Sequence, residues 1–292
     1  MAKIKFSLIK HPWLFLLVFF FATLVCFALA GAFLQEAFGL LPSSQKSSTW
    51  RMILGNLFLL FVVVPFILGF PKRRHPYETY LSEIRLTNLK PFFKLFILGI
   101  SCYLILALCQ AAGVLVFRLM HHLPINLSFM RYAFVLTKEL PPNSSNWFYS
   151  LPAILEEVAF RGVILAMFLR FYRQPKAILF SGLGFGVIHL LNLLDGGDPV
   201  WVIGQVGWAA ILGLFYGYVT LKTDSLIPAM IVHYLGNLFV SALNAFILLN
   251  GTAAEQALYG VIFTLGAVPV LFMSLWVRGF TSWMKLTPAT SP

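Results

Sequence analysis

The chain has 292 residues, of which 60% are hydrophobic and only 11% are charged. Soluble domains average about 25% charged and about 45–50% apolar residues, so this composition excludes an ordinary soluble domain and indicates a polytopic membrane protein. The formal net charge is +11, but the basic residues cluster in short segments between apolar runs, where anionic lipid headgroups are the natural partner. We therefore expect these charges to face a lipid bilayer and not a nucleic acid.

Eight apolar runs are long enough to cross a bilayer, since about 20 apolar residues make one crossing. In chain order they are residues 13–33, 52–70, 92–117, 147–169, 177–194, 200–221, 226–249 and 257–277. These runs predict an all-α fold of eight transmembrane helices. Between the second and third runs, residues 77–90 carry apolar side chains at helical spacing and predict a short amphipathic helix on the inner membrane surface.

The distribution of basic residues predicts the orientation of these spans. If the N-terminus is cytoplasmic, the inner segments hold 15 of the 21 lysines and arginines and the outer segments hold 5, with Arg161 inside a span. The positive-inside rule then places both termini in the cytoplasm. The plasma membrane of a bacterium or archaeon is the favoured location, with the endoplasmic reticulum as the alternative in a eukaryotic host.

We expect one structural domain with three segments. Residues 1–146 form an N-terminal membrane segment, residues 147–250 form the core, and residues 251–292 hold the last span and a cytoplasmic tail. The three cysteines, Cys26, Cys102 and Cys109, all fall inside predicted spans. An odd number of thiols within spans argues against a disulfide framework.

A few polar residues lie inside apolar runs, where an ionised group is costly and usually functional. The fourth run contains the neighbours Glu156 and Glu157 together with Arg161, and His189 and His233 are the histidines in the other runs. Two carboxylates, one arginine and two imidazoles on three spans indicate a buried reaction centre.

The spacing within the fourth run predicts different tasks for the two acids. Glu157 and Arg161 are four residues apart with the acid first, the favourable order for an ion pair on one helix face. Glu156 points about 100° away around the helix. It is therefore not neutralised by that arginine and is available to transfer protons.

The fifth and seventh runs supply further polar groups. Gly182 and Gly186 are four residues apart, which allows another helix to approach closely beside His189. His233 and Asn237 share a helix face, and both can donate hydrogen bonds to a developing oxyanion.

One difficulty concerns depth in the membrane. At about 1.5 Å per residue, Glu156 and His189 lie about 20 Å from the inner ends of their spans, whereas His233 lies only about 12 Å from the inner end of its own. A shared site therefore requires tilted helices, or a seventh span that begins from an inset turn at residues 222–225, which Pro228 would permit.

Three ordered motifs carry a family resemblance. They are Glu-Glu-x-x-x-Arg at 156–161, Phe-x-x-x-His at Phe185 and His189, and His-x-x-x-Asn at 233–237. On successive spans they resemble those of the CAAX prenyl endopeptidase type II family, also called the CPBP or Abi family of intramembrane proteases. The resemblance covers residues 147 to about 249, and no family resemblance is evident before residue 147.

The resemblance implies hydrolysis of a peptide bond in a membrane-embedded or lipidated protein or peptide. In the pattern of that family, Glu156 corresponds to the general base, and His189 corresponds to its partner in activating water. His233 and Asn237 match the oxyanion stabilisers. The supporting residues are Glu157, Arg161 and Phe185.

A mechanism without a cofactor is favoured, since no His-Glu-x-x-His helix is present. Zinc held by Glu156, His189 and His233 is the alternative, because histidines and carboxylates are zinc ligands.

Two other classes of function use the same residues. In a proton-coupled transporter the acids and histidines would form a proton relay, but inverted repeats and paired broken helices, which favour transport, are not evident in the sequence. In a catalytically silent membrane scaffold a motif residue would be lost, and all three motifs are intact.

Overall fold

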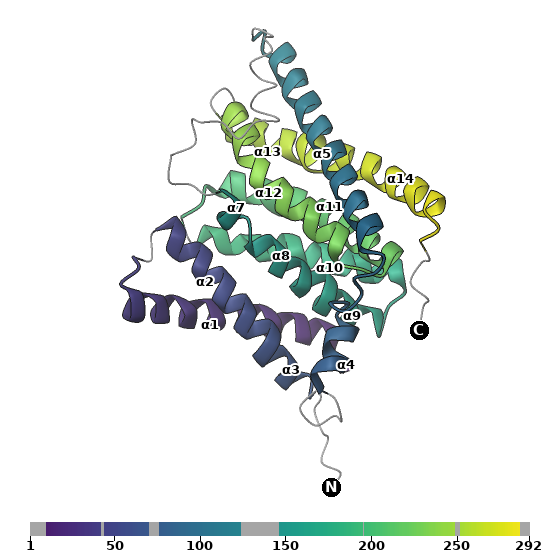
Figure 1. Ribbon diagram of the computed structural model, residues 1–292. Helices are drawn as coiled ribbons and strands as arrows, with labels where there is room; N and C mark the ends of the chain where they lie inside the picture. The colour runs from purple at the N-terminus through teal and green to yellow at the C-terminus, as the bar shows by residue number, and fades with distance from the viewer. Residues whose placement is uncertain are drawn as a thin grey trace.

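The computed structural model describes residues 10–41, 44–69, 76–123, 146–194, 196–248 and 252–286 (Figure 1). These residues form helices joined by turns, and none of them lies in a strand. The predicted all-α fold class is therefore confirmed for the described chain. The three cysteines are free thiols.

The described residues form the following helices. In chain order they are α1 (Pro12–Phe38), α2 (Gln45–Phe58), α3 (Val64–Ile67), α4 (Pro76–Glu83), α5 (Phe92–Met120), α7 (Asn146–Tyr149), α8 (Pro152–Glu157), α9 (Leu165–Leu169), α10 (Gln174–Ile188), α11 (Pro199–Thr223), α12 (Ile227–Leu248), α13 (Ala253–Tyr259) and α14 (Ala267–Trp283). Turns of π-helix at Leu59–Val63, Val158–Ile164 and Gly260–Thr264 continue α2 into α3, α8 into α9, and α13 towards α14. A 3₁₀ turn at His189–Leu193 extends α10.

Six of the described helices are long and apolar enough to cross a membrane. They are Pro12–Phe38, Gln45–Ile67, Phe92–Met120, Gln174–Leu193, Pro199–Thr223 and Ala257–Trp283. The predicted spans at 147–169 and 226–249 are not among them. A turn at residues 150–151 divides the first, and the second qualifies only as a shorter apolar helix over Ile227–Leu238. The number eight remains a prediction.

The helices form a bundle with two distinct ends (Figure 1). α1 begins and α14 ends at the same end, which also holds α4 and α9, and we call it the terminal end. The first residues of α2, together with α7 and α13, lie at the opposite end, the far end. Within the bundle α10 packs along α11, α12 along α5, and α1 along α2.

The close contact between α10 and α11 depends on glycine. A Cβ atom on Gly186 would lie 2.6 Å from the carbonyl oxygen of Val206, and one on Gly213 would lie 2.8 Å from the Cα of Gly182. No side chain fits at these distances, so the predicted close approach beside His189 is confirmed, with α11 as the neighbouring helix.

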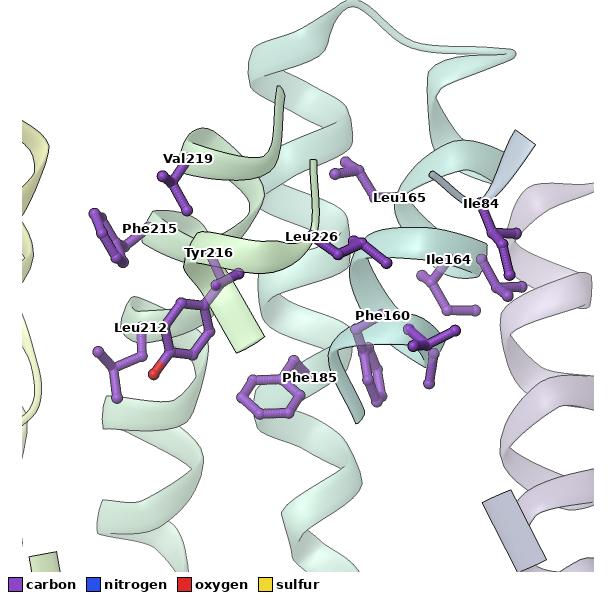
Figure 2. Close-up of a cluster of buried hydrophobic side chains, with 14 of the residues drawn as sticks. Ile84, Phe160, Ile164, Leu165, Phe185, Leu212, Phe215, Tyr216, Val219 and Leu226 are labelled. Carbon is purple, nitrogen blue, oxygen red and sulfur yellow. The ribbon is translucent and has the colours of Figure 1, made fainter. Parts of the chain in front are cut away.

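Buried aromatic and aliphatic side chains fill the space between α9, α10 and α11 (Figure 2). Phe160 and Phe185 meet edge to face, with ring centroids 5.1 Å apart. Ile84 and Leu226 come from turns at the terminal end and join the same cluster. The core thus extends from the terminal end into the middle of the bundle.

The helix predicted for residues 77–90 is shorter than expected. α4 ends at Glu83, and Arg85 adopts left-handed backbone angles with φ of 62°. Its apolar face also packs on protein, because Tyr80 and Ile84 are buried and the Tyr80 hydroxyl donates to the carbonyl oxygen of Leu60 at 2.6 Å. The segment after Glu83 makes contacts with a distant turn, which the local sequence pattern does not encode.

That distant turn joins α11 to α12 and is inset from the terminal end. Ser225 and Leu226 are only 1% and 2% exposed. Asn88 donates to the carboxylate of Asp224 at 2.9 Å, the Ser225 hydroxyl donates to the carbonyl oxygen of Asn88 at 2.7 Å, and Arg85 Nε donates to Asp224 at 2.9 Å. The segment 85–88 therefore covers the start of α12.

Candidate active site

The tandem glutamates end α8 and point in different directions. Glu156 is 19% exposed through its side chain and lines the main cavity, whereas the Glu157 side chain is fully buried. Successive residues of a helix differ in direction by about 100°, so one carboxylate meets the cavity and the other meets the protein interior.

Glu157 and Arg161 form the ion pair expected from their spacing. Arg161 Nη1 donates to Glu157 Oε1 at 3.2 Å, and both side chains are fully buried. The guanidinium carbon lies 4.3 Å from the ring centroid of Phe185 and 5.0 Å from that of Tyr216. The carboxylate and the two aromatic faces together compensate for removing the cation from water.

His233 joins this pair from α12. Its Nδ1 lies 2.7 Å from Glu157 Oε1, and its Nε2 lies 3.8 Å from Glu156 Oε2. An ionised carboxylate only accepts hydrogen bonds, so Nδ1 carries the proton that Glu157 binds. The packing of α12 thus brings His233 beside the two acids, which removes the difficulty of depth.

His189 lies where α10 passes into the 3₁₀ turn. Its Nδ1 is 2.8 Å from the carbonyl oxygen of Phe185, and since a carbonyl only accepts, Nδ1 donates. In the neutral ring, Nε2 then holds a lone pair that can accept a proton from water. The Phe185 ring packs edge to face against both His189 and His233, with centroids 5.0 and 5.5 Å away.

A cavity of about 560 Å³ brings the predicted catalytic residues together. Glu156, His189, His233 and Asn237 all line it, although they come from three different helical segments. A carboxylate, a ring nitrogen and two potential donors in the wall of one cavity form an arrangement suited to activating water and stabilising negative charge.

Several polar residues of this site were not predicted from the sequence. Tyr216 stacks on His233 with centroids 5.3 Å apart and planes 21° from parallel. Asn192 donates to Gln205 at 2.7 Å in the cavity wall, and Asn56 lies in the same wall. Uncharged polar residues within apolar runs are the sequence signal that marks these positions.

A zinc centre at this site would need at least three ligands around one ion. Within the described residues, no three His, Cys, Asp or Glu side chains are placed to hold one ion. His233 Nε2 and the Glu156 carboxylate lie 3.8 Å apart and could share an ion, but His189 does not complete a set of three with them. The arrangement in this structure therefore does not fit the zinc site of Glu156, His189 and His233.

The chain was compared with known protein families, curated proteins and solved structures. No curated protein and no solved structure matches the chain. Residues 146–239 match the family model described as Type II CAAX prenyl endopeptidase Rce1-like. The matched segment runs from α7 into α12 and contains all three motifs, so the resemblance of this segment to the type II CAAX prenyl endopeptidase family is confirmed.

Proposed function

We propose that this integral membrane protein is an intramembrane endopeptidase that hydrolyses a peptide bond in a membrane-embedded or lipidated peptide or protein. The observation that carries the proposal is that Glu156, His189, His233 and Asn237 line one cavity. The family match supports the class of reaction.

Water activation is assigned to Glu156 with His189. The Glu156 carboxylate removes a proton from a water molecule that His189 Nε2 helps to orient, and the resulting hydroxide attacks the carbonyl carbon of the peptide. A new C–O bond forms, and the carbonyl oxygen becomes an oxyanion. Glu156 then returns the proton to the amide nitrogen, and the C–N bond breaks.

Oxyanion stabilisation is assigned to His233 and Asn237. Glu157 accepts from His233 Nδ1 at 2.7 Å and so orients the ring with Nε2 towards Glu156. The assigned role uses the doubly protonated imidazole, in which Nε2 donates to the oxyanion. Asn237 lies one helical turn further along α12 and adds an amide donor from the same face. Arg161 and Phe185 hold Glu157 and the two imidazoles in these positions.

This reaction requires no metal ion. The water is activated by a carboxylate, and the oxyanion is stabilised by N–H groups of the chain. The positions of Glu156, His189 and His233 support a metal-independent mechanism, since they do not form a three-ligand set.

The proposal is tested by comparing the termini of membrane peptides from cells that carry the wild type or Glu156→Gln. New termini that depend on Glu156, and on His189 and His233 in the corresponding alanine variants, are the expected result. Glu36→Gln, on an exposed position of α1, is the matched control and should cut normally. Unchanged termini in all variants, with wild-type protein present, would instead favour a transporter or a scaffold.

A further inference from the structure

Two carboxamide side chains form a pair in the wall of the cavity. Asn192, in the 3₁₀ turn after α10, donates from Nδ2 to Oε1 of Gln205 on α11 at 2.7 Å. Both residues line the cavity, and both are half-buried. The catalytic roles proposed above use neither residue, so this amide pair is a polar feature of the cavity without an assigned task.

The amide pair keeps hydrogen-bonding groups that no protein atom uses. A carboxamide has two N–H donors and an oxygen that can accept twice. Within the part of the chain that the structure describes, Asn192 Oδ1 and Gln205 Nε2 have no hydrogen-bond partner, and neither is among the fully buried polar atoms. The pair therefore presents one acceptor and one donor to a ligand in the cavity.

This acceptor and donor match the backbone of an extended peptide. The N–H and C=O of one residue point to the same edge of an extended strand, where an antiparallel partner binds both. The N–H can donate to Asn192 Oδ1, and the C=O can accept from Gln205 Nε2. An apolar group would leave both amides without partners, and a carboxylate or an ammonium would satisfy only one of them.

The helix geometry places the amide pair near the reaction centre. His189 begins the 3₁₀ turn, and Asn192 is its fourth residue. Side chains three residues apart in a 3₁₀ helix eclipse each other, and a rise of about 2.0 Å per residue separates them by about 6 Å along the axis. Asn192 therefore lies on the same side of the turn as His189, and both line the cavity.

The separation of about 6 Å corresponds to roughly two residues of an extended peptide, which rises about 3.3 Å per residue. A peptide whose reactive carbonyl lies beside His189 would thus bring the backbone of a nearby residue to the amide pair. Trp201 lies one helical turn before Gln205 on α11 and also lines the cavity, so its ring adds apolar surface beside the pair.

We propose that Asn192 and Gln205 form a subsite that binds the backbone N–H and C=O of one substrate residue, roughly two residues from the bond that is cut. This subsite rests on the proposed function and adds to it. Because it recognises the backbone, it fixes the position of the peptide beside Glu156 without selecting a side chain. The amide pair itself takes no part in the chemical step.

Binding of a short peptide tests the subsite without any need for cleavage. The peptide is acetyl-trileucine methylamide, whose only polar groups are backbone amides. Its Kd in detergent is measured from tryptophan fluorescence, since Trp201 and Trp208 line the cavity. All proteins carry Glu156→Gln, which removes the proposed base, so the peptide stays intact whether or not the wild type is a protease. The test protein adds Asn192→Leu and Gln205→Met, which keep the approximate shapes and remove both amides.

We expect Kd to rise at least about tenfold in the test protein with no change in Tm, because at least one hydrogen bond of typical strength is lost. A depsipeptide, in which ester oxygens replace the backbone N–H groups, cannot donate to Asn192, and its Kd should rise at most about threefold. Gln174→Met is the matched control for removing an amide. Gln174 is exposed at the start of α10 and does not line the cavity, so Kd should stay unchanged.

Three results would overturn the subsite. They are an equal Kd for the trileucine peptide in both proteins, an equally large rise for the depsipeptide, and no measurable binding of the trileucine peptide to the Glu156→Gln protein. If the test protein unfolds in detergent, Gln205→Met alone decides, and its Kd should rise about threefold.

A glutamine side chain is the other source of an amide, and acetyl-Leu-Gln-Leu methylamide tests it. If only this peptide loses affinity in the test protein, the pair recognises a side chain and the backbone assignment is wrong. Cleavage is measured separately, in protein that retains Glu156. Peptide binding that depends on the amide pair in a protein that cuts nothing would refute the proteolysis alone, and cleavage without such binding would refute the subsite alone.

Discussion

Glu157 and His233 are 76 positions apart in the chain, yet Nδ1 of the imidazole lies 2.7 Å from a carboxylate oxygen of the glutamate. This contact joins the motif of α8 to the motif of α12. In the proposed mechanism it gives the second acid of the tandem the task of orienting the imidazole.

The variant Glu157→Gln tests that task. The amide keeps the shape of the side chain but loses the negative charge that His233 Nδ1 contacts and that compensates Arg161. We expect kcat to fall by about 10²–10⁴-fold, as in a triad whose acid is neutralised, and stability to fall by about 3–5 kcal/mol. Peptide cleavage and Tm in detergent measure the two effects.

The half-exposed pair of Glu83 and Arg170 supplies the control for this experiment. Its side chains are each 33% exposed, and such pairs contribute about 1 kcal/mol or less. Glu83→Gln should therefore leave kcat unchanged and Tm nearly so. Near-wild-type cleavage in Glu157→Gln would contradict the role given to the buried contact.

Asn237 offers a direct test of oxyanion stabilisation. Removing one such donor costs about 10²–10³-fold in kcat in other hydrolases, so Asn237→Ala should lower kcat by that order with little change in KM. Asn237→Asp has the same shape but cannot donate when ionised, and it should be at least as impaired. An active Asp variant would exclude Asn237 as a donor.

The contact between α10 and α11 predicts a specific loss of stability. In Gly186→Ala the new methyl group would lie 2.6 Å from the Val206 carbonyl oxygen, and overpacking of this kind costs about 1–3 kcal/mol. Gly279→Ala is the control, because a Cβ there meets no atom within 4 Å. Thermal unfolding in detergent should show a lower Tm for the first variant only.

Metal independence is checked by removing metal. Cleavage should survive dialysis against EDTA and 1,10-phenanthroline, and the purified protein should contain less than one zinc ion per chain by elemental analysis. Activity that is lost on chelation and restored by zinc would contradict the proposal, as would stoichiometric zinc whose removal abolishes cleavage.

The sequence alone was sufficient for the fold class and for the residues that gather at the site. Because ionisable groups are costly in an apolar span, the sequence predicts Glu156, His189 and His233 as candidate site residues without any knowledge of the fold. The spacing of Glu157 and Arg161 predicted their ion pair, because both residues lie on one helix.

Contacts between segments could not be predicted in this way. The stacking of Tyr216 on His233 and the position of Asn56 in the cavity wall depend on how α2, α11 and α12 pack, and helical periodicity within one span does not encode that packing. The end of α4 at Glu83 has a similar cause, since the next residues bond to the turn at Asp224.

The π-helical segment Val158–Ile164 directly follows the two glutamates. A π turn accommodates one more residue than an α turn, and each residue of a helix advances the direction of its side chain by about 100°. Deleting a single residue from this segment would rotate α8 relative to α9 by about that angle. The direction in which each acid points relative to α9 therefore depends on this extra residue, and the four-residue spacing of Glu157 and Arg161 sets which acid meets the arginine.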